Sequence, residues 1–356
     1  MNKDSKIFVA GHNGLVGSGI LNNLRSKGYH NFVLRSHNEL DLTDQQAVEA
    51  FFKQERPEYV FLAAAHVGGI MANSIYRADF IYFNLQIQNN IIQNAWKYGI
   101  KKLLFLGSTC IYPRDAPQPM KEDCLLTSPL EYTNEPYAIS KIAGLKMCES
   151  YNLQYGTNYI AVMPTNLYGP NDNFNLEKSH VLPALIRKAH LGKCLLNQEH
   201  EAIRADFDQY PVEGVDGKAS WDAILGKLAK YGITTDHISI WGTGTPTREF
   251  LWSEDMADAC VFVMEKVDFS DLKGTGNEIR NCHINIGTGK EISIKGLAKL
   301  VASKIGYKGS LVFDSTKPDG TIRKLTDPSK LHNLGWHHKI ELEEGIELLY
   351  NWYLKN

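Results

Sequence analysis

The chain has 356 residues, of which 43% are hydrophobic and 22% are charged, so its length suits one large or two modest globular domains. A formal net charge of −2 provides no general attraction to nucleic acid or to an anionic membrane surface. The sequence has no apolar run of about 18 residues, and the opening "MNKDSKIFVAGHNG" lacks the apolar core of a signal peptide, so we expect a cytoplasmic protein.

Short apolar runs alternate with amphipathic ones in the first part of the chain. The strand-like runs are "KIFVA" (6–10), "NFVLR" (31–35), "YVFLAAA" (59–65), "KLLFLG" (102–107) and "YIAVMP" (159–164). Helical periodicity fills most of the intervals, at 15–27, 44–54, 80–98 and 137–155. Continuous apolar strands separated by helices predict an α/β domain over residues 1–167, with a doubly wound parallel sheet of the Rossmann type.

The pattern loosens beyond this domain. The stretch "TNLYGPNDNFN" has the composition of a loop, and the tail holds a strand ("HINIG"), a helix (293–305), a strand ("SLVF") and a final amphipathic helix (341–354). These elements predict a smaller α/β substrate lobe made of residues 168–239 and 266–356. A segment near 240–265 is expected to return to the first domain, and the cleft between the lobes is the natural place for a site.

Residues 197–237 stand apart as an insertion rich in charged and turn residues. Near its end, Trp221, Ile224, Leu225 and Leu228 fall at i, i+3, i+4 and i+7, and Gly232 follows as a helix stop. The insertion is therefore predicted to end in one amphipathic helix. It could cap the cleft, form an oligomer contact or decorate the surface.

A glycine-rich turn follows the first strand. In "KIFVAGHNGLVG", Gly11, Gly14 and Gly17 have the spacing that lets a turn tighten and a backbone approach a pyrophosphate at a helix N-terminus. The strand before it and the helix after it agree with this interpretation. The sequence therefore predicts a dinucleotide-binding site.

The end of the second strand concerns the choice of dinucleotide. NAD-binding chains commonly place a carboxylate here, whereas this chain has Arg35, Ser36 and His37, which can donate to a 2′-phosphate. These residues favour NADP(H) over NAD(H). Further residues expected near the cofactor are Asp41 and Leu42, at a turn beside the adenine, and the small residues Ala63, Ala64 and Ala65.

Three side chains form a candidate catalytic set. Tyr137 and Lys141 lie at i and i+4 of a helix in "NEPYAISKIAG", and Ser108 lies at the end of a strand. An ammonium one turn from a phenol is expected to favour the phenolate and to bring its pKa toward the working range. Ser108 would complete a donor pair around a substrate carbonyl, and Lys141 could also bond the nicotinamide ribose.

The six cysteines are scattered and contain no C-x-x-C pair, so the sequence supports neither a metal cluster nor a disulfide framework. Reduced thiols are expected. Cys110, in "LGSTCIYP", lies two residues after Ser108 and on the same face if the strand continues.

These motifs together resemble a known family. "GHNGLVGS", "KLLFLGSTCIYP", "NEPYAISKIAG", "VMPTNLYGP", "WGTGTP" and "NIGTG" are similar to the extended short-chain dehydrogenases/reductases, and more narrowly to the GDP-L-fucose synthases. Those enzymes act as GDP-4-keto-6-deoxy-D-mannose 3,5-epimerases and 4-reductases. The similarity covers nearly all the chain except about 197–237.

The resemblance assigns roles to particular residues. It implies that Ser108, Tyr137 and Lys141 perform the reduction and that Cys110 and His180 perform the epimerisation. A ketone at C4 acidifies the protons at C3 and C5, and inversion needs one base and one acid on opposite faces. A thiol and an imidazole titrate near enough to neutrality to serve.

The remaining assignments concern binding. Besides the residues already named, the resemblance implies cofactor contacts from Asn13, Leu15, Val16, Pro164, Asn166, Leu167 and His180. It implies substrate contacts from Ser108, Thr109, Cys110, Asn166, Val181, Lys188, Trp241, Arg248 and Lys324, of which the last two and Lys188 would meet the diphosphate. It also implies a homodimer.

The chain departs from the family at several places. Family members often carry arginines at the positions of Asn13 and His37, and a lysine at that of His66. The insertion could reshape the sugar pocket, so a GDP-4-keto-6-deoxy-heptose 4-reductase without epimerase activity stays open. An NAD-dependent nucleotide-sugar 4-epimerase and a Rossmann-type redox regulator are the alternatives of other classes.

Overall fold

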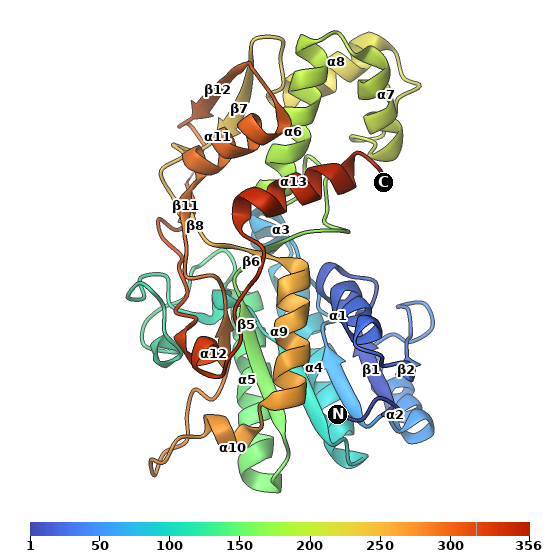
Figure 1. The fold of residues 1–356 in the computed structure, drawn as a ribbon, viewed down its shortest axis with the longest axis vertical. Coiled ribbons are helices and arrows are strands. Elements are labelled where there is room, and N and C mark those ends of the chain that lie inside the picture. The colour runs from blue at the N-terminus through green and yellow to red at the C-terminus, as the bar shows by residue number, and fades with distance from the viewer. Residues whose placement is uncertain (318) are drawn as a thin grey trace. The chain divides into compact units, whose positions relative to one another are not determined.

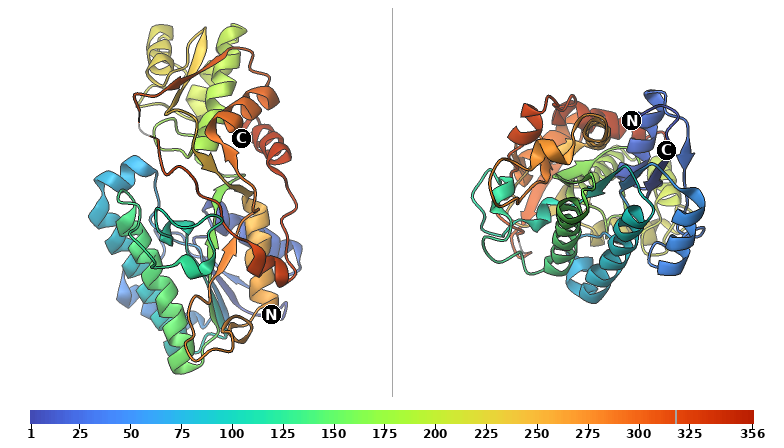
Figure 2. Two further views of the ribbon diagram at one scale, coloured as in Figure 1. Left: turned by 90° about the vertical axis from the view of Figure 1, so that its left-hand side faces the viewer. Right: turned by 90° about the horizontal axis from the view of Figure 1, so that it is seen from below.

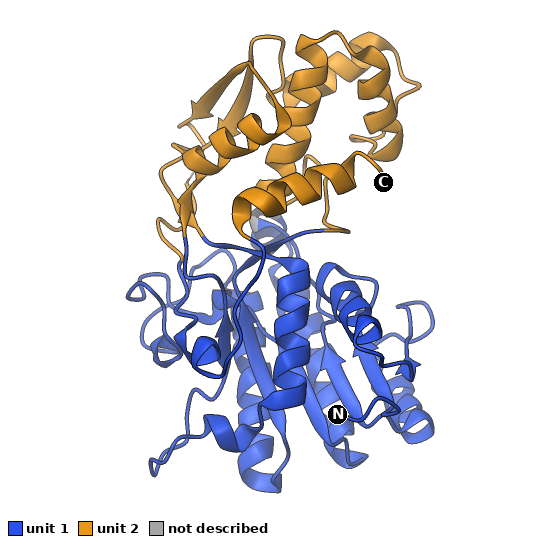
Figure 3. Cartoon of the chain, in the orientation of Figure 1, with its two compact units in different colours: residues 1–169, 249–290, 325–340 blue, residues 170–248, 291–324, 341–356 orange. Residues whose placement is uncertain are grey.

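The computed structural model describes residues 1–317 and 319–356 and divides into two compact units (Figure 3). Unit 1 comprises Met1–Gly169, Glu249–Lys290 and Leu325–Ile340, and unit 2 comprises Pro170–Arg248, Glu291–Lys324 and Glu341–Asn356. Neither unit is therefore one continuous stretch of sequence. No helix within the described residues is long and apolar enough to span a membrane.

Unit 1 is built on a six-stranded parallel sheet with the order β10-β5-β4-β3-β1-β2 (Figure 1). Its strands are β1 (Ile7–Ala10), β2 (Phe32–Val33), β3 (Tyr59–Leu62), β4 (Lys102–Leu106), β5 (Tyr159–Pro164) and β10 (Ile284–Ile286). The chain places β2 on one side of β1 and β3 on the other. The carboxyl ends of β1 and β3 are thus the switch point at which sheets of this kind bind ligands.

Helices cover both faces of this sheet, which confirms the doubly wound architecture. Phe8 and Ala10 of β1 pack into one core, and Ile7 and Val9 pack into the other, because alternate strand residues point to opposite faces. The first core is covered by α2 (Gln45–Glu55), α4 (Arg77–Lys97) and α5 (Glu135–Tyr155), and the second by α1 (Leu15–Ser26), α9 (Ser253–Lys266) and α12 (Ser329–Asn333). Helices α4 and α5 run side by side (Figure 2).

The other elements of unit 1 are short. They are α3 (Ile70–Ile75), α10 (Phe269–Leu272), the 3₁₀ turns η1 (Thr109–Ile111) and η2 (Glu122–Cys124), and the parallel pair β6 (Asn166–Tyr168) and β9 (Phe250–Trp252). Local chemistry sets the helix ends. Asp44 caps α2 by accepting from two first-turn N–H groups, while α5 has a proline in its first turn and ends at Gly156 with φ of 68°.

The structure corrects the predicted division of the chain in three places. The strand in "HINIG" was expected in the second lobe, but it forms β10 and pairs with β5, so residues 266–290 belong to unit 1. Residues 325–340 also join unit 1, where Leu331 of α12 is buried under the sheet. The return segment begins at Glu249, so the residues between 240 and 248 belong to unit 2.

Unit 2 is a smaller assembly of helices and short strand pairs. Its elements are α6 (Val181–Leu196), α7 (His200–Gln209), α8 (Trp221–Lys230), β7 (His237–Trp241), β8 (Thr247–Arg248), β11 (Ile292–Ser293), α11 (Ile294–Ile305), β12 (Ser310–Asp314) and α13 (Leu342–Tyr353). Strand β12 pairs with β7 in parallel, and β11 pairs with β8 in antiparallel fashion. Helix α11 packs against both α6 and α13.

The insertion contains two helices, one more than the sequence predicted. Helix α8 begins one residue after Ser220, whose hydroxyl accepts from Ala223 N–H, but α7 was not foreseen in the charged stretch before it. Ile203 and Phe207 of α7 are fully buried with residues of α6 and α8. The insertion therefore has a core shared with α6, which a surface decoration would not need.

Candidate active site

The glycine turn lies at the switch point of the sheet. Gly11 has φ of 85°, and a Cβ there would come within 2.8 Å of the Ala64 backbone nitrogen, which follows β3. A Cβ on Gly17 would meet the Gly11 carbonyl oxygen at 2.0 Å. Only glycine fits at both positions, so the turn is compressed between the ends of β1 and β3.

The first turn of α1 fits an anionic cofactor. Gly14 is the N-cap residue of α1. Because it has no side chain, it cannot accept a hydrogen bond from the first-turn N–H groups, such as those of Leu15 and Val16. A helix N-terminus with such groups attracts a pyrophosphate. This arrangement suits the phosphates of a dinucleotide bound across the switch point.

The residues expected at a 2′-phosphate have carboxylate partners in this structure. Arg35 Nη2 donates to Glu55 Oε1 at 2.7 Å, and Lys6 bonds the same carboxylate. The Ser36 N–H and hydroxyl both donate to Glu39 Oε2 at 2.7 Å. These donors lower the pKa of the Glu39 and Glu55 carboxyls, so both side chains are held as carboxylates. To bind Arg35 or Ser36, a 2′-phosphate would have to displace the carboxylate that already accepts from it.

Other expected cofactor residues have structural partners or lie near the same edge. Asp41 accepts from Thr43 N–H and its hydroxyl, which fixes the turn after the second strand. The described positions of the rest are the N-terminal turn (Asn13), the segment after β3 (Ala63, Ala64, Ala65), the end of β5 (Pro164), and β6 (Asn166, Leu167). Leu42 packs partly buried against the core of unit 1.

The structure brings Ser108, Tyr137 and Lys141 together at the end of β4. Ser108 follows β4 and its hydroxyl bonds the Tyr137 phenol. Lys141, one turn along α5, donates from Nζ to the Leu106 carbonyl oxygen at 2.8 Å, and the same Nζ lies 5.7 Å from the centre of the Tyr137 ring. The three side chains predicted from sequence to work together are therefore neighbours.

Burial reverses one electrostatic expectation. The sequence predicts that Lys141 brings the pKa of Tyr137 down, but burial raises that pKa above its ordinary value, and the nearby Cys110 raises it further. Burial also lowers the pKa of Lys141 to about 7. The expectation was wrong for the protein alone because desolvation has the largest effect on Tyr137 and disfavours its charged phenolate.

Cys110 lies beside this set, but not on a continued strand. Strand β4 ends at Leu106, and Cys110 is in the 3₁₀ turn η1, where Ser108 caps the turn by accepting from the Cys110 N–H at 3.2 Å. Asn134 Nδ2 donates to Cys110 Sγ at 3.4 Å. None of the six cysteines, all of which are described, forms a disulfide.

Two residues of unit 1 near the site were missed in the sequence. Asn134 contacts the sulfur of Cys110, and its only signal is a polar residue just before the helix of Tyr137. Glu249 is fully buried, and its carboxylate accepts from the N–H groups of Thr288, Gly289 and Thr326 and from the Thr326 hydroxyl. Its only signal is an acid before the apolar run "FLW".

Glu249 also supports Asn166. Asn166 Nδ2 donates to the Glu249 backbone oxygen at 2.8 Å. Strand β9 begins at the next residue, Phe250, and pairs with β6. The buried carboxylate thereby ties β9, the turn at 288–289 and residue 326 into one rigid base. Asn166, expected at cofactor or substrate, is held by that base.

The other expected substrate residues lie in unit 2. His180 is the N-cap residue of α6, Val181 begins that helix, and desolvation lowers the pKa of the His180 imidazole. Lys188, on the same helix, donates to the Ser239 carbonyl oxygen at 3.0 Å, and burial lowers its pKa to about 8. An anionic ligand would stabilise the charge of a lysine that burial disfavours in this way.

Arg248, Trp241 and Lys324 complete the set in unit 2. Arg248 Nη1 donates to the carbonyl oxygens of Thr247 and Thr321, at 2.7 and 2.6 Å, which fixes the guanidinium beside the segment that ends at Lys324. Trp241, at the end of β7, is 61% exposed. A large exposed indole is a surface on which a flat or polar ligand can pack.

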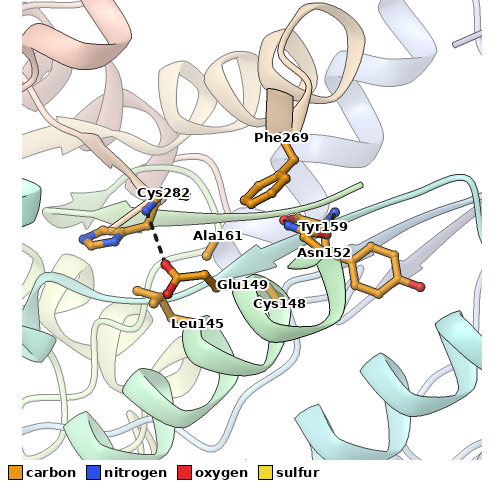
Figure 4. Close-up of a pocket in the computed structure, with 9 residues that line it drawn as sticks. Leu145, Cys148, Glu149, Asn152, Tyr159, Ala161, Phe269 and Cys282 are labelled. Carbon is orange, nitrogen blue, oxygen red and sulfur yellow. Dashed lines mark hydrogen bonds between the residues drawn. The ribbon is translucent and has the colours of Figure 1, made fainter. Parts of the chain in front are cut away.

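A separate small cavity lies along the second half of α5 (Figure 4). It is lined by Leu145, Cys148, Glu149, Asn152, Tyr159, Ala161, Phe269, Cys282 and His283. Burial lowers the pKa of His283 to about 3, so this imidazole stays neutral. The residues expected to bind cofactor or substrate, all within the described chain, are not among those that line it.

Comparisons with known proteins agree with this geometry. The model of the NAD dependent epimerase/dehydratase family matches residues 7–224 and 216–287. GDP-L-fucose synthase 1 of Arabidopsis thaliana is 51% identical over 355 residues, which is 100% of this chain and 95% of that protein.

Two solved structures from Campylobacter jejuni are also similar. A GDP-6-OMe-4-keto-L-xylo-heptose reductase is 46% identical, with a TM-score of 0.93 over 100% of this chain and 99% of that one. A GDP-mannoheptose C4 reductase with NADP bound is 45% identical, with a TM-score of 0.88 over 99% of each chain.

Proposed function

The chain belongs to the NAD dependent epimerase/dehydratase family, and on that premise we propose that it is an NADPH-dependent reductase of a GDP-linked 4-keto-6-deoxy sugar, with C3/C5 epimerisation before the reduction. The observation that carries the proposal is the cluster in unit 1 of Ser108, Cys110, Tyr137 and Lys141. Such a product is of the GDP-L-fucose type, the kind named for the plant relative.

The reduction uses the three neighbours at the end of β4. When bound, NADPH would provide the hydride needed to reduce C4 of the sugar. The Tyr137 phenol, kept protonated by burial, gives its proton to the C4 oxygen, and the Ser108 hydroxyl bonds the same oxygen as its negative charge develops. Lys141 stabilises the phenolate that remains.

Epimerisation uses the pair that the family resemblance assigns. The carbonyl at C4 acidifies the protons at C3 and C5, so one member of the pair removes a proton and the other returns one to the opposite face. Cys110 and His180 have these roles in the proposal. Desolvation lowers the pKa of His180, which makes its protonated imidazole a stronger acid for returning a proton to carbon.

The cofactor is NADP(H). The second strand ends without an acid at the ribose position and offers Arg35 and Ser36 instead. One of the similar heptose reductases holds NADP. The glycine turn and the open N-terminus of α1 fit the pyrophosphate that NADP and NAD share.

The similarity to two heptose reductases favours one alternative, a GDP-4-keto-heptose 4-reductase without epimerisation. Incubating the enzyme with NADPH and the keto-sugar in deuterated water separates the two functions. We expect deuterium at C3 and C5 of the product, detected by mass spectrometry and NMR. A reduced product without deuterium at either carbon would exclude the epimerase.

A cytoplasmic location and a homodimer complete the proposal. Large apolar side chains remain exposed on the adjacent helices α4 (Tyr82 and Trp96) and α5 (Ile139, Leu153 and Tyr155), as expected for a helix-to-helix interface. Light scattering after size-exclusion chromatography tests the assembly. A monomer mass at micromolar concentration would contradict the dimer.

A further inference from the structure

The loop that leads into α5 carries a side chain in contact with the sulfur of Cys110. Asn134 Nδ2 donates to Cys110 Sγ at 3.4 Å. The Oδ1 atom of the same amide is buried and has no hydrogen-bond partner among the described residues. The amide therefore gives its donor to the sulfur and leaves its acceptor for a group outside the protein, an arrangement that functional sites tolerate.

Asn134 does not serve α5 in the way its position suggests. An asparagine at the N-cap position normally accepts from a first-turn N–H, but here the side chain makes no such bond. The loop is fixed by Glu131, whose carboxylate accepts from the N–H groups of Thr133 and Asn134 and from the Thr133 hydroxyl. Since another residue holds the loop, the Asn134 amide is free of that task and faces the sulfur.

We propose that Asn134 is a positioning residue for Cys110 in the epimerisation step, an inference that rests on the proposed function. The side-chain Nδ2–H of Asn134 stabilises and orients the Cys110 thiolate. The Oδ1 atom of the same side chain accepts a hydrogen bond from a hydroxyl of the sugar. A donor to the charged form of a group favours that form. The thiolate is the form of cysteine able to take a proton.

The step balances in charge and protons. The thiolate takes a proton from C3 or C5, the carbon–hydrogen bond breaks, and its electron pair moves toward the C4 oxygen. The protonated imidazole of His180, the other member of the catalytic pair, then gives a proton to the opposite face of that carbon and is left neutral, while the electron pair returns from the C4 oxygen to the carbon. Because Cys110 begins this step charged and ends it neutral, a donor such as Asn134 raises the fraction of enzyme ready to begin at neutral pH.

The contact is tested by alkylating the full-length protein with iodoacetamide as a function of pH. Cys110 is partly exposed and the other five cysteines are buried, so the reagent reports Cys110, and Cys110→Ser gives the background rate. In Asn134→Leu the midpoint is expected to rise by about one pH unit, which is about a tenfold loss of thiolate on the low-pH side. Asn134→Asp, which adds a negative charge, should raise it as well.

Thr133→Val is the matched control because it removes a hydrogen bond to Glu131 from the same loop and leaves the sulfur contact intact. Its midpoint should equal that of the wild type. An unchanged midpoint in both Asn134 variants would overturn the proposal.

The reaction provides a second readout. Asn134→Leu is expected to incorporate deuterium at C3 and C5 about tenfold more slowly than the wild type at pH 7, with most of the deficit recovered at pH 9. An equal deficit at both values would indicate a structural loss and overturn the proposal. If the wild-type enzyme exchanges neither the C3 nor the C5 proton, the proposed epimerase activity is refuted. The pH profile of alkylation would then test separately whether Asn134 stabilises the Cys110 thiolate.

Discussion

Removing the carboxylate of Asp206 tests how the insertion is held to α6. Arg187 is fully buried, and its Nε and Nη2 donate to Asp206 Oδ1 at 3.0 and 2.7 Å. The remaining guanidinium donors reach the carbonyl oxygens of Phe174 and Tyr210, and the Tyr353 hydroxyl bonds Asp206 Oδ2. One ion pair therefore joins α6, α7 and α13.

Asp206→Ala would leave the guanidinium of Arg187 buried without a counter-charge. Breaking a buried pair on one side costs about 3–5 kcal/mol, because the remaining charge cannot regain its water. Replacing both partners by apolar residues, as in Arg187→Met with Asp206→Leu, should recover most of that loss. The double variant thus separates the cost of a lone charge from the loss of packing.

Urea unfolding followed by circular dichroism measures these differences in the free energy of unfolding. Asp208→Ala is the control, because Asp208 lies on the same helix, is exposed, and accepts from the Gly217 N–H without an ion pair to any described residue. It should lose about 1 kcal/mol or less. If Asp206→Ala stays within about 0.5 kcal/mol of the wild type, the ion pair does not hold the insertion and the reasoning fails.

Three further predictions concern the site. Tyr137→Phe should keep cofactor binding, measured by NADPH fluorescence titration, and lose about 10²–10⁴-fold in reduction, so near-normal turnover would refute the acid role. Arg35→Ala should raise the KM for NADPH about tenfold or more, since one charge-assisted bond to the 2′-phosphate is lost, and should leave the KM for NADH unchanged. An equal rise in both KM values would contradict the role of Arg35 at the 2′-phosphate. Lys141→Met should be more stable than the wild type at pH 7, and the advantage should shrink toward pH 10. The reason is that the pKa of Lys141 is about 7 when folded and about 10.5 when unfolded, so between these values the unfolded chain binds the extra proton and wild-type stability rises with pH. An advantage that does not change with pH in thermal melts would contradict the lowered pKa.

The parts of the fold predicted correctly depend on neighbours in the sequence. Alternating apolar and amphipathic runs gave the strands and helices of the sheet, because each period is a property of a few consecutive residues. The second helix of the insertion was missed because Ile203 and Phe207 lie among charged residues, and their burial depends on α6 and α8. Local pattern alone could not show that those partners exist.

Strand pairing shows the same limit. The apolar run in "HINIG" identifies β10 as a strand, but its place beside β5 in unit 1 depends on residues more than a hundred positions earlier. A continuous apolar strand suits any buried parallel position. Its sequence therefore carries no information on which sheet it joins.

Sequence by itself determined the chemistry available to this protein: a glycine turn for a dinucleotide, a serine, tyrosine and lysine in the right order, and a cysteine beside them. Tertiary structure decided their electrostatic state and their partners. It buries Tyr137 and Lys141 so that desolvation sets their pKa values, pairs Arg35 with Glu55, and places Asn134 against Cys110 across 24 positions. Residue types follow from the order of the chain, whereas burial and contact depend on which distant segments fold against each other.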